Sequence, residues 1–255
     1  ESFTYGLTEQ TSVEGNTPAM SSTMAGTYGT LSIDSSTGKY TYTLNNGSQV
    51  VQTLREGETR TETFHVIVKD SQGAFDIKDV VVNITGTNDA PTFGTGTTIV
   101  VTESGVANGG NVATDGKNQA ASVIRFSDVD STQDKLICTI TNPGASGIDS
   151  SGIQTLVTKY GTFTLDTRTG EYSFTLNNDA PEVQQLNAGE LLNASNTPEL
   201  RLNLKVTDEY GASGTSSVQA QIKGTNDVPH LTLNQPSLDV KEDDTLAASG
   251  TVAVS

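Results

Sequence analysis

The sequence predicts an all-β chain of tandem antiparallel β-sandwiches, and three observations lead to this prediction. Apolar residues alternate with polar ones over short stretches, as they do in strands that pack one face and expose the other. A long segment recurs further along the chain, which indicates more than one domain of the same kind. Hydrophobic residues make up only 33% of the 255 residues, while glycine alone occurs 25 times, a composition that suits thin sandwiches with many turns.

The alternation is clearest at four places in the first copy and at four in the second. In the first copy the apolar positions are Leu31/Ile33, Tyr40/Tyr42/Leu44, Phe64/Val66/Val68 and Val80/Val82/Ile84. In the second copy they are Phe163/Leu165, Tyr172/Phe174/Leu176, Leu202/Leu204/Val206 and Val218/Ala220/Ile222. Each set predicts a strand with these side chains on the packed face. No stretch has the spacing typical of a helix.

The repeat itself is long and mostly free of gaps. Residues 28–46 match residues 160–178 at more than half of their positions, with a shift of 132 in residue number. From Phe64 onward, which aligns with Leu202, the shift becomes 138, so the second copy carries about six extra residues. We expect a longer surface loop around Asn193 to Pro198. Asp34 to Gly38 and Asp166 to Gly170 lie between predicted strands and end in glycine, so both are predicted hairpin turns.

A short stretch, Gly-Thr-Asn-Asp-x-Pro, closes each copy. It occupies residues 86–91, here named the first joint, and residues 224–229, the second joint. The proline restricts the residue before it to extended backbone, and Asn and Asp supply oxygen atoms. The spacing predicts a partial repeat at residues 1–88 that lacks its opening strands, a complete repeat at 89–226, and the opening strands of a third at 227–255.

The charge balance limits the classes of partner. Thirty acidic residues against fourteen basic ones give a net charge of −16, and a nucleic-acid partner would need a basic face instead. Diffuse acidity serves solubility in many proteins, and clustered carboxylates also bind cations, so both interpretations stay open. No apolar run is long enough to span a membrane. Cys138 is the single cysteine, which excludes an intramolecular disulfide, and we expect it in the core.

The densest carboxylate group is the Asp-x-Asp of Asp128 and Asp130. In an extended segment these two side chains point to the same side of the backbone, about 7 Å apart at their α-carbons. One cation fits between them, and Ca²⁺ accepts six to eight hard oxygen ligands in irregular geometry. Two carboxylates are too few for such a site. The residues expected to add oxygen ligands are Asn88, Asp89, Asp208 and Glu58.

Two glutamates, Glu103 and Glu242, begin the same strand in successive repeats. They are candidate ligands as well. The alternative interpretation is an exposed charge on an edge strand, which discourages aggregation.

The order of these motifs resembles a known family. A strand-opening Glu, Asp-x-Asp, a Gly-Glu segment, Asp-x-x-Gly and a closing Thr-Asn-Asp-x-Pro are similar to the cadherin-like tandem repeats, of VCBS type, in large secreted bacterial adhesins of the RTX class. The resemblance covers nearly the whole chain and implies cadherin-like or Ig-like Greek-key sandwiches. It also implies a location outside the cell, at the bacterial surface, in cell adhesion and biofilm formation.

Carried onto this sequence, the resemblance implies Ca²⁺ at each joint between repeats. The set at the first joint is Glu58, Asn88, Asp89, Asp128, Asp130 and Asp208. The set at the second joint is Glu103, Glu190, Asn226 and Asp227, and it lacks an Asp-x-Asp from the third repeat. Asp70 faces a joint before residue 1. We therefore expect the first joint to be fully liganded and the second to be under-liganded.

The function expected from these features is that of a structural extender, in which Ca²⁺ stiffens the joints between neighbouring repeats of the same chain. Alternatives are a module that binds carbohydrate or a host protein, through residues 193–198 or 11–24, and a homophilic adhesion module. A ligand of the whole protein could also bind other domains. No residues form a catalytic constellation, because neither His65 nor His230 accompanies a nucleophile, and we expect no enzyme activity.

Overall fold

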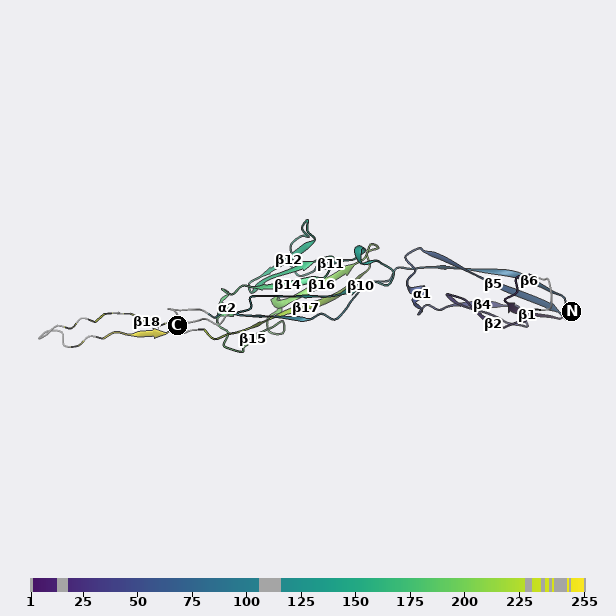
Figure 1. Cartoon of the computed structure of the whole chain (residues 1–255). Helices are drawn as coiled ribbons and strands as arrows, with labels where there is room; N and C mark the ends of the chain where they lie inside the picture. Colours follow the sequence, from purple (N-terminus) through teal and green to yellow (C-terminus); the bar gives the residue numbers. More distant parts are fainter. Residues whose placement is uncertain are drawn as a thin grey trace. The chain divides into compact units, whose positions relative to one another are not determined.

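The computed structural model describes residues 2–12, 18–105, 116–227, 231–234, 237–238, 240, 247 and 249–254. Its elements are strands connected by turns, with very little helix (Figure 1). The predicted all-β class is therefore confirmed. No helix in this described part is long and apolar enough to cross a membrane.

The chain forms two compact units. Unit 1 contains Glu1–Pro91, Ser127–Leu136 and Thr207–Ser213, and unit 2 contains Thr92–Phe126, Ile137–Val206 and Gly214–Ser255. Two loops of the predicted second repeat thus belong to unit 1, which matters for the candidate site below. The predicted repeat boundaries at residues 88 and 226 stay a prediction about the sequence repeats.

Unit 1 contains two three-stranded sheets. One has the order β1-β5-β6 and the other β2-β3-β4. Their bounds are β1 Phe3–Thr8, β2 Thr23–Ala25, β3 Gly29–Ile33, β4 Tyr40–Leu44, β5 Thr59–Asp70 and β6 Phe75–Thr85. Neighbouring strands in both sheets pair antiparallel, for example Phe64 with Val80 and Leu31 with Tyr42. Leu7, Leu31, Ile33 and Phe64 form its buried core.

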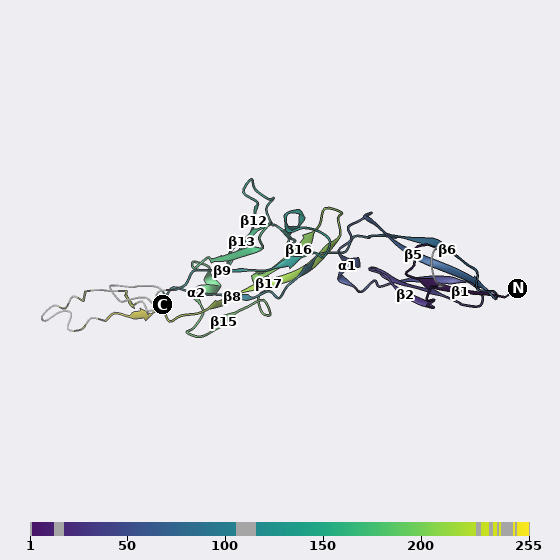
Figure 2. The ribbon, with the colours of Figure 1, turned by 45° about the vertical axis from the view of Figure 1, so that its right-hand side comes forward.

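Unit 2 has one sheet of five strands and one of four, which Figure 2 shows as separate layers. The five-stranded sheet contains β11 Ile137–Ile140, β16 Arg201–Thr207, β17 Ser213–Lys223, β15 Leu191–Leu192 and β8 Thr98–Thr102, which pairs parallel with β17. The four-stranded sheet contains β12 Ile153–Thr158, β13 Gly161–Asp166, β14 Glu171–Leu176 and β9 Gln119–Val123. Two further pairs of short strands are β7 Thr92–Phe93 with β10 Phe126–Ser127, and β18 Leu231–Leu233 with β19 Val252–Val254.

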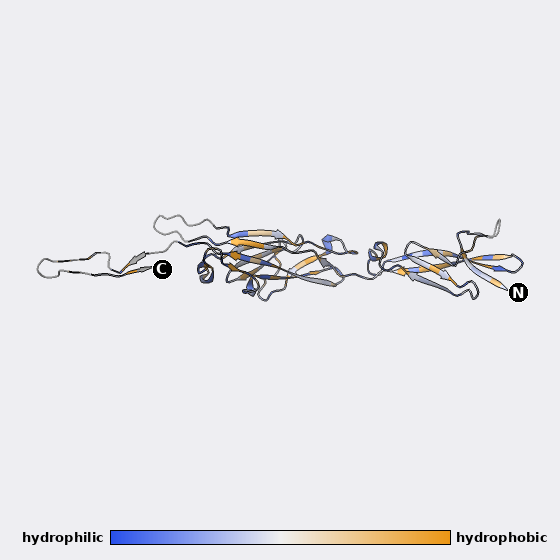
Figure 3. Cartoon of the chain, turned by 90° about the horizontal axis from the view of Figure 1, so that it is seen from below, coloured by the Kyte–Doolittle hydropathy of each residue, from blue (hydrophilic) through white to orange (hydrophobic). Residues whose placement is uncertain are grey.

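The core of unit 2 follows the predicted alternation. Phe163, Leu165, Tyr172 and Phe174 of the four-stranded sheet are fully buried, and the rings of Phe163 and Phe174 lie 4.6 Å apart between centroids. The opposing sheet buries Leu202, Leu204, Val206, Val218, Ala220 and Ile222. Figure 3 shows hydrophobic and hydrophilic residues alternating along the strands. Packing of one face of each sheet is what the period of two predicts.

The same prediction is wrong for part of unit 1. Tyr40 and Leu44 of β4 were expected on the packed face, yet they are 53% and 37% exposed, while the equivalent Tyr172 and Leu176 are buried. In unit 2, β14 lies between β13 and β9. Among the described residues of unit 1, β4 pairs only with β3. The missing neighbour leaves one edge of β4 open, and its apolar side chains are exposed for that reason.

Short helices occur where none was predicted. α1 Gln49–Gln52 and α2 Pro181–Gln184 are single turns at equivalent positions of the two copies, and 3₁₀ turns occupy η1 Gln133–Lys135 and η2 Pro198–Leu200. Each α turn buries one valine, Val51 or Val183. One turn is too short to produce a 3.6-residue pattern in the sequence, so periodicity could not reveal it.

The extra residues of the second copy interrupt a strand. In unit 1, β5 runs without a break and pairs Thr59 with Thr85. The equivalent pair in unit 2, Leu191 with Lys223, belongs to the separate short strand β15, and β16 begins only at Arg201. The predicted loop lies between them, and it is less exposed than expected because Ala194 and Thr197 are buried.

Both predicted hairpin turns are present, each with its aspartate bonded to the turn backbone. Oδ1 of Asp34 accepts hydrogen bonds from the N–H groups of Ser36 and Thr37, and Gly38 has a φ of 73° that favours glycine. Asp166 and Gly170 repeat this arrangement between β13 and β14. Closing the turn backbone is a role that accounts for all of these contacts of the two aspartates.

Asp34 predicts acid sensitivity in the β3–β4 hairpin. The Ser36 hydroxyl and the N–H groups of Thr37 and Ser36 lower the pKa of Asp34 to about 2. A lowered pKa stabilises the fold above the unfolded value near 4, and this contribution is lost as the pH falls from about 4 to 2. We expect Asp34→Asn to flatten the dependence of the melting temperature on pH in this window. Asp76→Asn, which removes an exposed carboxylate of β6, is the control and keeps the wild-type slope; an equal change in both variants would contradict the assignment.

Candidate metal centre

The structure brings five of the predicted ligands together in unit 1. Nδ2 of Asn88 donates a hydrogen bond to Oδ2 of Asp208 at 2.8 Å. The backbone N–H of Asp89 donates to Oδ2 of Asp130 at 3.2 Å, and the N–H of Asp130 donates to Oδ1 of Asp128 at 3.2 Å. These contacts join residues 120 and 41 positions apart in the sequence. We name Asn88, Asp89, Asp128, Asp130 and Asp208 the joint cluster.

The joint cluster contains buried oxygen atoms that no donor reaches. Oδ1 of Asn88, Oδ2 of Asp128 and Oδ1 of Asp130 are buried and have no hydrogen-bond partner within the described part of the chain, and the same holds for Oγ of the adjacent Ser131. Leaving a buried oxygen unsatisfied costs about 1–3 kcal/mol, and more for a charged group. A cation would satisfy several such oxygens at once.

The electrostatics of Asp130 point the same way. Asp130 is only 5% exposed. Its burial, and after that the neighbouring Asp128, raise the pKa of Asp130 to about 6. The charge of Asp89 acts in the same direction, while the hydrogen bond from the Asp89 N–H opposes it. The ionised form is therefore disfavoured by its surroundings, and a bound cation would reverse that preference.

The residue types fit calcium better than a transition metal. In the described part of the chain no three side chains of His, Cys, Asp or Glu are grouped so that they could hold a metal ion by themselves. The joint cluster instead combines carboxylates with an amide, beside a serine hydroxyl. Such a set of hard oxygen donors is what Ca²⁺ accepts, whereas zinc sites use sulfur and nitrogen ligands.

Glu56, which was not among the predicted ligands, also contacts the first joint. The N–H of Asn88 donates to Oε2 of Glu56 at 2.7 Å. The shift of 132 carries Glu56 onto Ala188, so the second joint has no equivalent acceptor. The difference between Glu56 and Ala188 is visible in the alignment of the two copies, and it is the sequence signal that distinguishes Glu56.

Glu58 and Glu190 close equivalent turns in the two copies. Oε2 of Glu58 accepts a hydrogen bond from the N–H of Arg55 at 3.1 Å, and Glu58 also forms an ion pair with Arg60. Oε2 of Glu190 accepts from the N–H of Asn187 at 2.7 Å. The glycine before each, Gly57 or Gly189, has a positive φ. The backbone carbonyls of Glu58 and Glu190 accept from the N–H groups of Gly86 and Gly224 at 2.8 and 2.9 Å. Within the described residues neither carboxylate bonds the Asn-Asp pair of its joint, so the part of both glutamates in metal binding stays a prediction.

Asp70 and Asp208 occupy equivalent hairpins. Oδ1 of each accepts two backbone N–H groups of its turn, from Gln72 and Ala74 or from Tyr210 and Ala212. In Asp208 the second oxygen remains for Asn88. The structure therefore gives both a turn-closing role, and it connects only Asp208 to the joint cluster. The predicted ligand Glu242 lies outside the described residues.

Glu103 is buried, so the interpretation as an exposed edge charge is wrong. It has no exposed surface, and its carboxylate accepts from the N–H of Thr225 at 3.2 Å and from Nε2 of Gln184 at 3.2 Å. Burial raises the pKa of Glu103, and the charge of Asp227 adds to this effect. Asp227 is thus close enough to interact, whereas Asn226 is exposed and bonds the carbonyl of Asp227.

Cys138 is fully buried in β11, as predicted. Burial raises the pKa of its thiol to about 12, which keeps it protonated at neutral pH. The other candidate for chemistry, His65, lies beside Asp79 with 2.7 Å between Nδ1 and Oδ1. Neither residue belongs to the joint cluster.

Comparison with known proteins gives structural matches only. No protein-family model matches the sequence, and no curated protein matches it. Solved structures that resemble the chain are extracellular cadherin domains. Domains EC1–4 of the protocadherin PcdhgB3 align at 13% identity with a TM-score of 0.44, over 99% of this chain and 49% of that one. Domains EC21–23 of human CDH23 align at 14% identity with a TM-score of 0.42, over 99% and 68%. The chain spans about half the length of the first protocadherin, and its function has to come from its own residues.

Proposed function

We propose that this chain is a structural extender of a cell-surface adhesin, in which Ca²⁺ bound at the joints between tandem β-sandwich repeats limits their flexing. The observation that carries the proposal is the set of buried oxygens without donors on Asn88, Asp128 and Asp130. Ca²⁺ would supply positive charge and accept several oxygen ligands at once. The bacterial surface location, the RTX class and a role in biofilms rest on the sequence resemblance.

The residues of the joint cluster come from three separated parts of the chain. Asn88 and Asp89 follow the last strand of the first copy, while Asp128, Asp130 and Asp208 lie in loops of the second copy. Without a cation the carboxylates repel one another, which favours opening of these loops. When their charge is neutralised, the loops stay on the joint, and the chain has less freedom between consecutive copies.

The second joint supports a weaker site. Glu103 and Asp227 interact there, and Glu103 already uses its oxygens on Thr225 and Gln184. The joint also lacks a counterpart of Glu56, because the shift of 132 places Ala188 at that position. We therefore keep the proposal that the first joint binds Ca²⁺ more tightly than the second within this chain.

Small-angle scattering tests the extender proposal. We expect the maximum dimension of the chain to be larger and its distribution narrower in millimolar Ca²⁺ than in chelator, because repulsion at the joint no longer favours bent conformations. Limited proteolysis should slow under the same condition, since loops held closed are poorer substrates. Asp128→Asn/Asp130→Asn is expected to give the same scattering and cleavage in both buffers, because it has lost two of the proposed ligands. Identical scattering and cleavage with Ca²⁺ and with chelator would contradict the proposal.

A further inference from the structure

On the outer face of the five-stranded sheet in unit 2, the charge carried by the strands is opposite in sign to the net charge of the whole chain. Its strands β8, β11, β15, β16 and β17 contain no Asp or Glu, although the chain has 30 of them. They carry three cations, Arg201, Lys205 and Lys223, and none of these forms an ion pair within the described residues. The Debye length is about 8 Å at physiological salt, so this local charge, rather than the net −16, decides what approaches the face.

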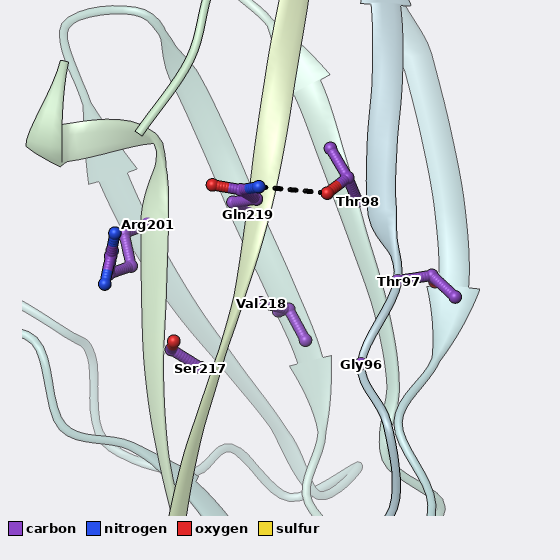
Figure 4. A pocket seen from close by; sticks show the side chains of 7 residues that line it. All are labelled: Gly96, Thr97, Thr98, Arg201, Ser217, Val218 and Gln219. Atoms are coloured by element: carbon purple, nitrogen blue, oxygen red, sulfur yellow. Dashed lines mark hydrogen bonds between the residues drawn. The ribbon is translucent and has the colours of Figure 1, made fainter. Parts of the chain in front are cut away.

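A polar groove of about 270 Å³ opens on this sheet, lined by Gly96, Thr97, Thr98, Arg201, Ser217, Val218 and Gln219. Figure 4 shows Arg201 and Ser217 on one side of Gln219, and Thr98 with the segment of Gly96 and Thr97 on the other. Only Val218 is apolar among the side chains, and it is buried. The lining offers a guanidinium, hydroxyls and an amide, with no aromatic ring on which a base or an apolar ligand could stack.

The walls of the groove are held in place by contacts outside it. The hydroxyl of Thr97 bonds Oγ of Ser122 at 2.6 Å, and Tyr172 donates its hydroxyl hydrogen to the carbonyl of Thr97 at 2.5 Å. A Cβ at Gly96 would lie 2.7 Å from Cγ1 of Val218, so only glycine allows the chain to run this close to β17. A wall fixed in this way loses little entropy when a ligand binds.

The polar groups present a definite pattern to a ligand. Nε2 of Gln219 donates to Oγ1 of Thr98 at 3.0 Å, which leaves Oε1 of Gln219 as an acceptor and the Thr98 hydroxyl hydrogen as a donor. The guanidinium of Arg201 has no partner among the described residues, and it presents the planar fork that matches a carboxylate or sulfate. A ligand that fits carries one anionic group with hydroxyl groups beside it.

We propose that this groove binds one acidic sugar unit of an anionic glycan, with Arg201 holding the anionic group and Thr98, Ser217 and Gln219 contacting the hydroxyls. Nucleic acid fits less well, because it needs more cations and aromatic stacking than this face offers. The groove involves none of the residues of the joint cluster. Glycan binding is therefore expected in the presence of a calcium chelator, which separates this proposal from the proposed extender function.

The test is an NMR titration of the ¹⁵N-labelled full chain with a galacturonate trimer in the presence of a calcium chelator. The amide chemical shifts are monitored during the titration. We expect saturable shifts centred on residues 96–98 and 217–219. Arg201→Gln is expected to weaken binding about tenfold, which is the loss of about 1.4 kcal/mol. Arg201→Lys, which keeps the charge without the fork, should fall between this variant and the wild type. Arg125→Gln removes an exposed arginine that does not line the groove and is expected to stay within about twofold of the wild type.

Further titrations with related ligands distinguish which anionic group the groove binds. The methyl-esterified trimer should bind about tenfold more weakly than the free acid, since it offers no charge to Arg201. A sulfated disaccharide that shifts the same amides would also support the proposal. Inorganic sulfate that binds as tightly as the sugar would show that the groove is only an anion site, and it would overturn the proposal. The absence of saturable shifts, an equal loss in Arg125→Gln, or binding only when Ca²⁺ is added would also overturn it.

Discussion

Asp130→Asn is expected to change the stability of unit 1 in opposite directions with and without Ca²⁺. In chelator the variant should be more stable than the wild type by about 1–3 kcal/mol, because it replaces a buried carboxylate, crowded by Asp128 and Asp89, with a neutral isostere. In excess Ca²⁺ the wild type gains binding free energy, about 2.7 kcal/mol at a hundredfold excess over its Kd, and the variant gains less. The order of the two melting temperatures should then reverse.

Differential scanning calorimetry in the two buffers measures this reversal. Asp76→Asn removes an exposed carboxylate of the same unit and serves as the control, which should shift the transition equally in both buffers. A shift of the same sign for Asp130→Asn with and without Ca²⁺ would mean that its carboxylate is not a ligand.

Glu62→Ala is expected to destabilise unit 1 by about 3 kcal/mol, independently of Ca²⁺. The buried carboxylate of Glu62 accepts from the N–H of Thr27 at 2.5 Å, from the N–H of Tyr28 at 3.2 Å, and from the hydroxyl of Tyr42. Truncation leaves these three donors without an acceptor. Burial and then Glu62 itself raise the pKa of the Tyr42 hydroxyl, which is consistent with a donor held beside a carboxylate.

The second copy provides the matched control for this prediction. The shift of 132 carries Tyr42 onto Phe174, and the shift of 138, extended two residues back from Phe64, carries Glu62 onto Leu200. Both are fully buried apolar residues. Glu62→Leu/Tyr42→Phe should therefore recover more than half of the stability lost in Glu62→Ala, because both partners of the polar contact are replaced together. Denaturant unfolding measures the loss. A double variant as unstable as Glu62→Ala would show that the two N–H groups of Thr27 and Tyr28 dominate.

The fold could be predicted to a large extent because the strands are half-buried and regularly spaced. The alternation that places Phe163 and Leu165 inward is a property of neighbouring residues in one strand, and it is readable from the sequence. The exposure of Tyr40 and Leu44 was not readable, since it depends on whether another strand lies beside β4. Strand neighbours are determined by tertiary structure, and the local pattern is the same in both copies.

The candidate site was predictable in its residue types and less so in its contacts. The repetition of Asn-Asp at both joints and the Asp-x-Asp at Asp128 led to the residues that the structure brings together. Glu58, which aligns with Glu190, was a predicted ligand, yet the carboxylate that bonds Asn88 is that of Glu56. The burial of Glu103 could not be inferred either, because an isolated glutamate at a strand end is more often solvated.

The unsatisfied oxygens of the joint cluster are the feature that sequence reasoning could not supply. Counting carboxylates shows how much negative charge a segment has, but it does not show which oxygens are buried or which donors reach them. Asp130 is 5% exposed, and one of its oxygens lacks a donor. Both properties depend on packing between segments that are distant in the sequence. Burial without a partner is what turns an acidic segment into a candidate cation site.

A calorimetric Ca²⁺ titration at neutral pH tests the central claim most directly. It compares the wild type with Asp128→Asn/Asp130→Asn. The control is Asp76→Asn/Asp79→Asn, which removes two exposed carboxylates of unit 1. We expect saturable heat in the wild type and in the control, and the loss of the tightest binding event in Asp128→Asn/Asp130→Asn. A wild type without saturable heat, or a joint variant that binds Ca²⁺ as tightly as the wild type, would contradict calcium binding at the first joint.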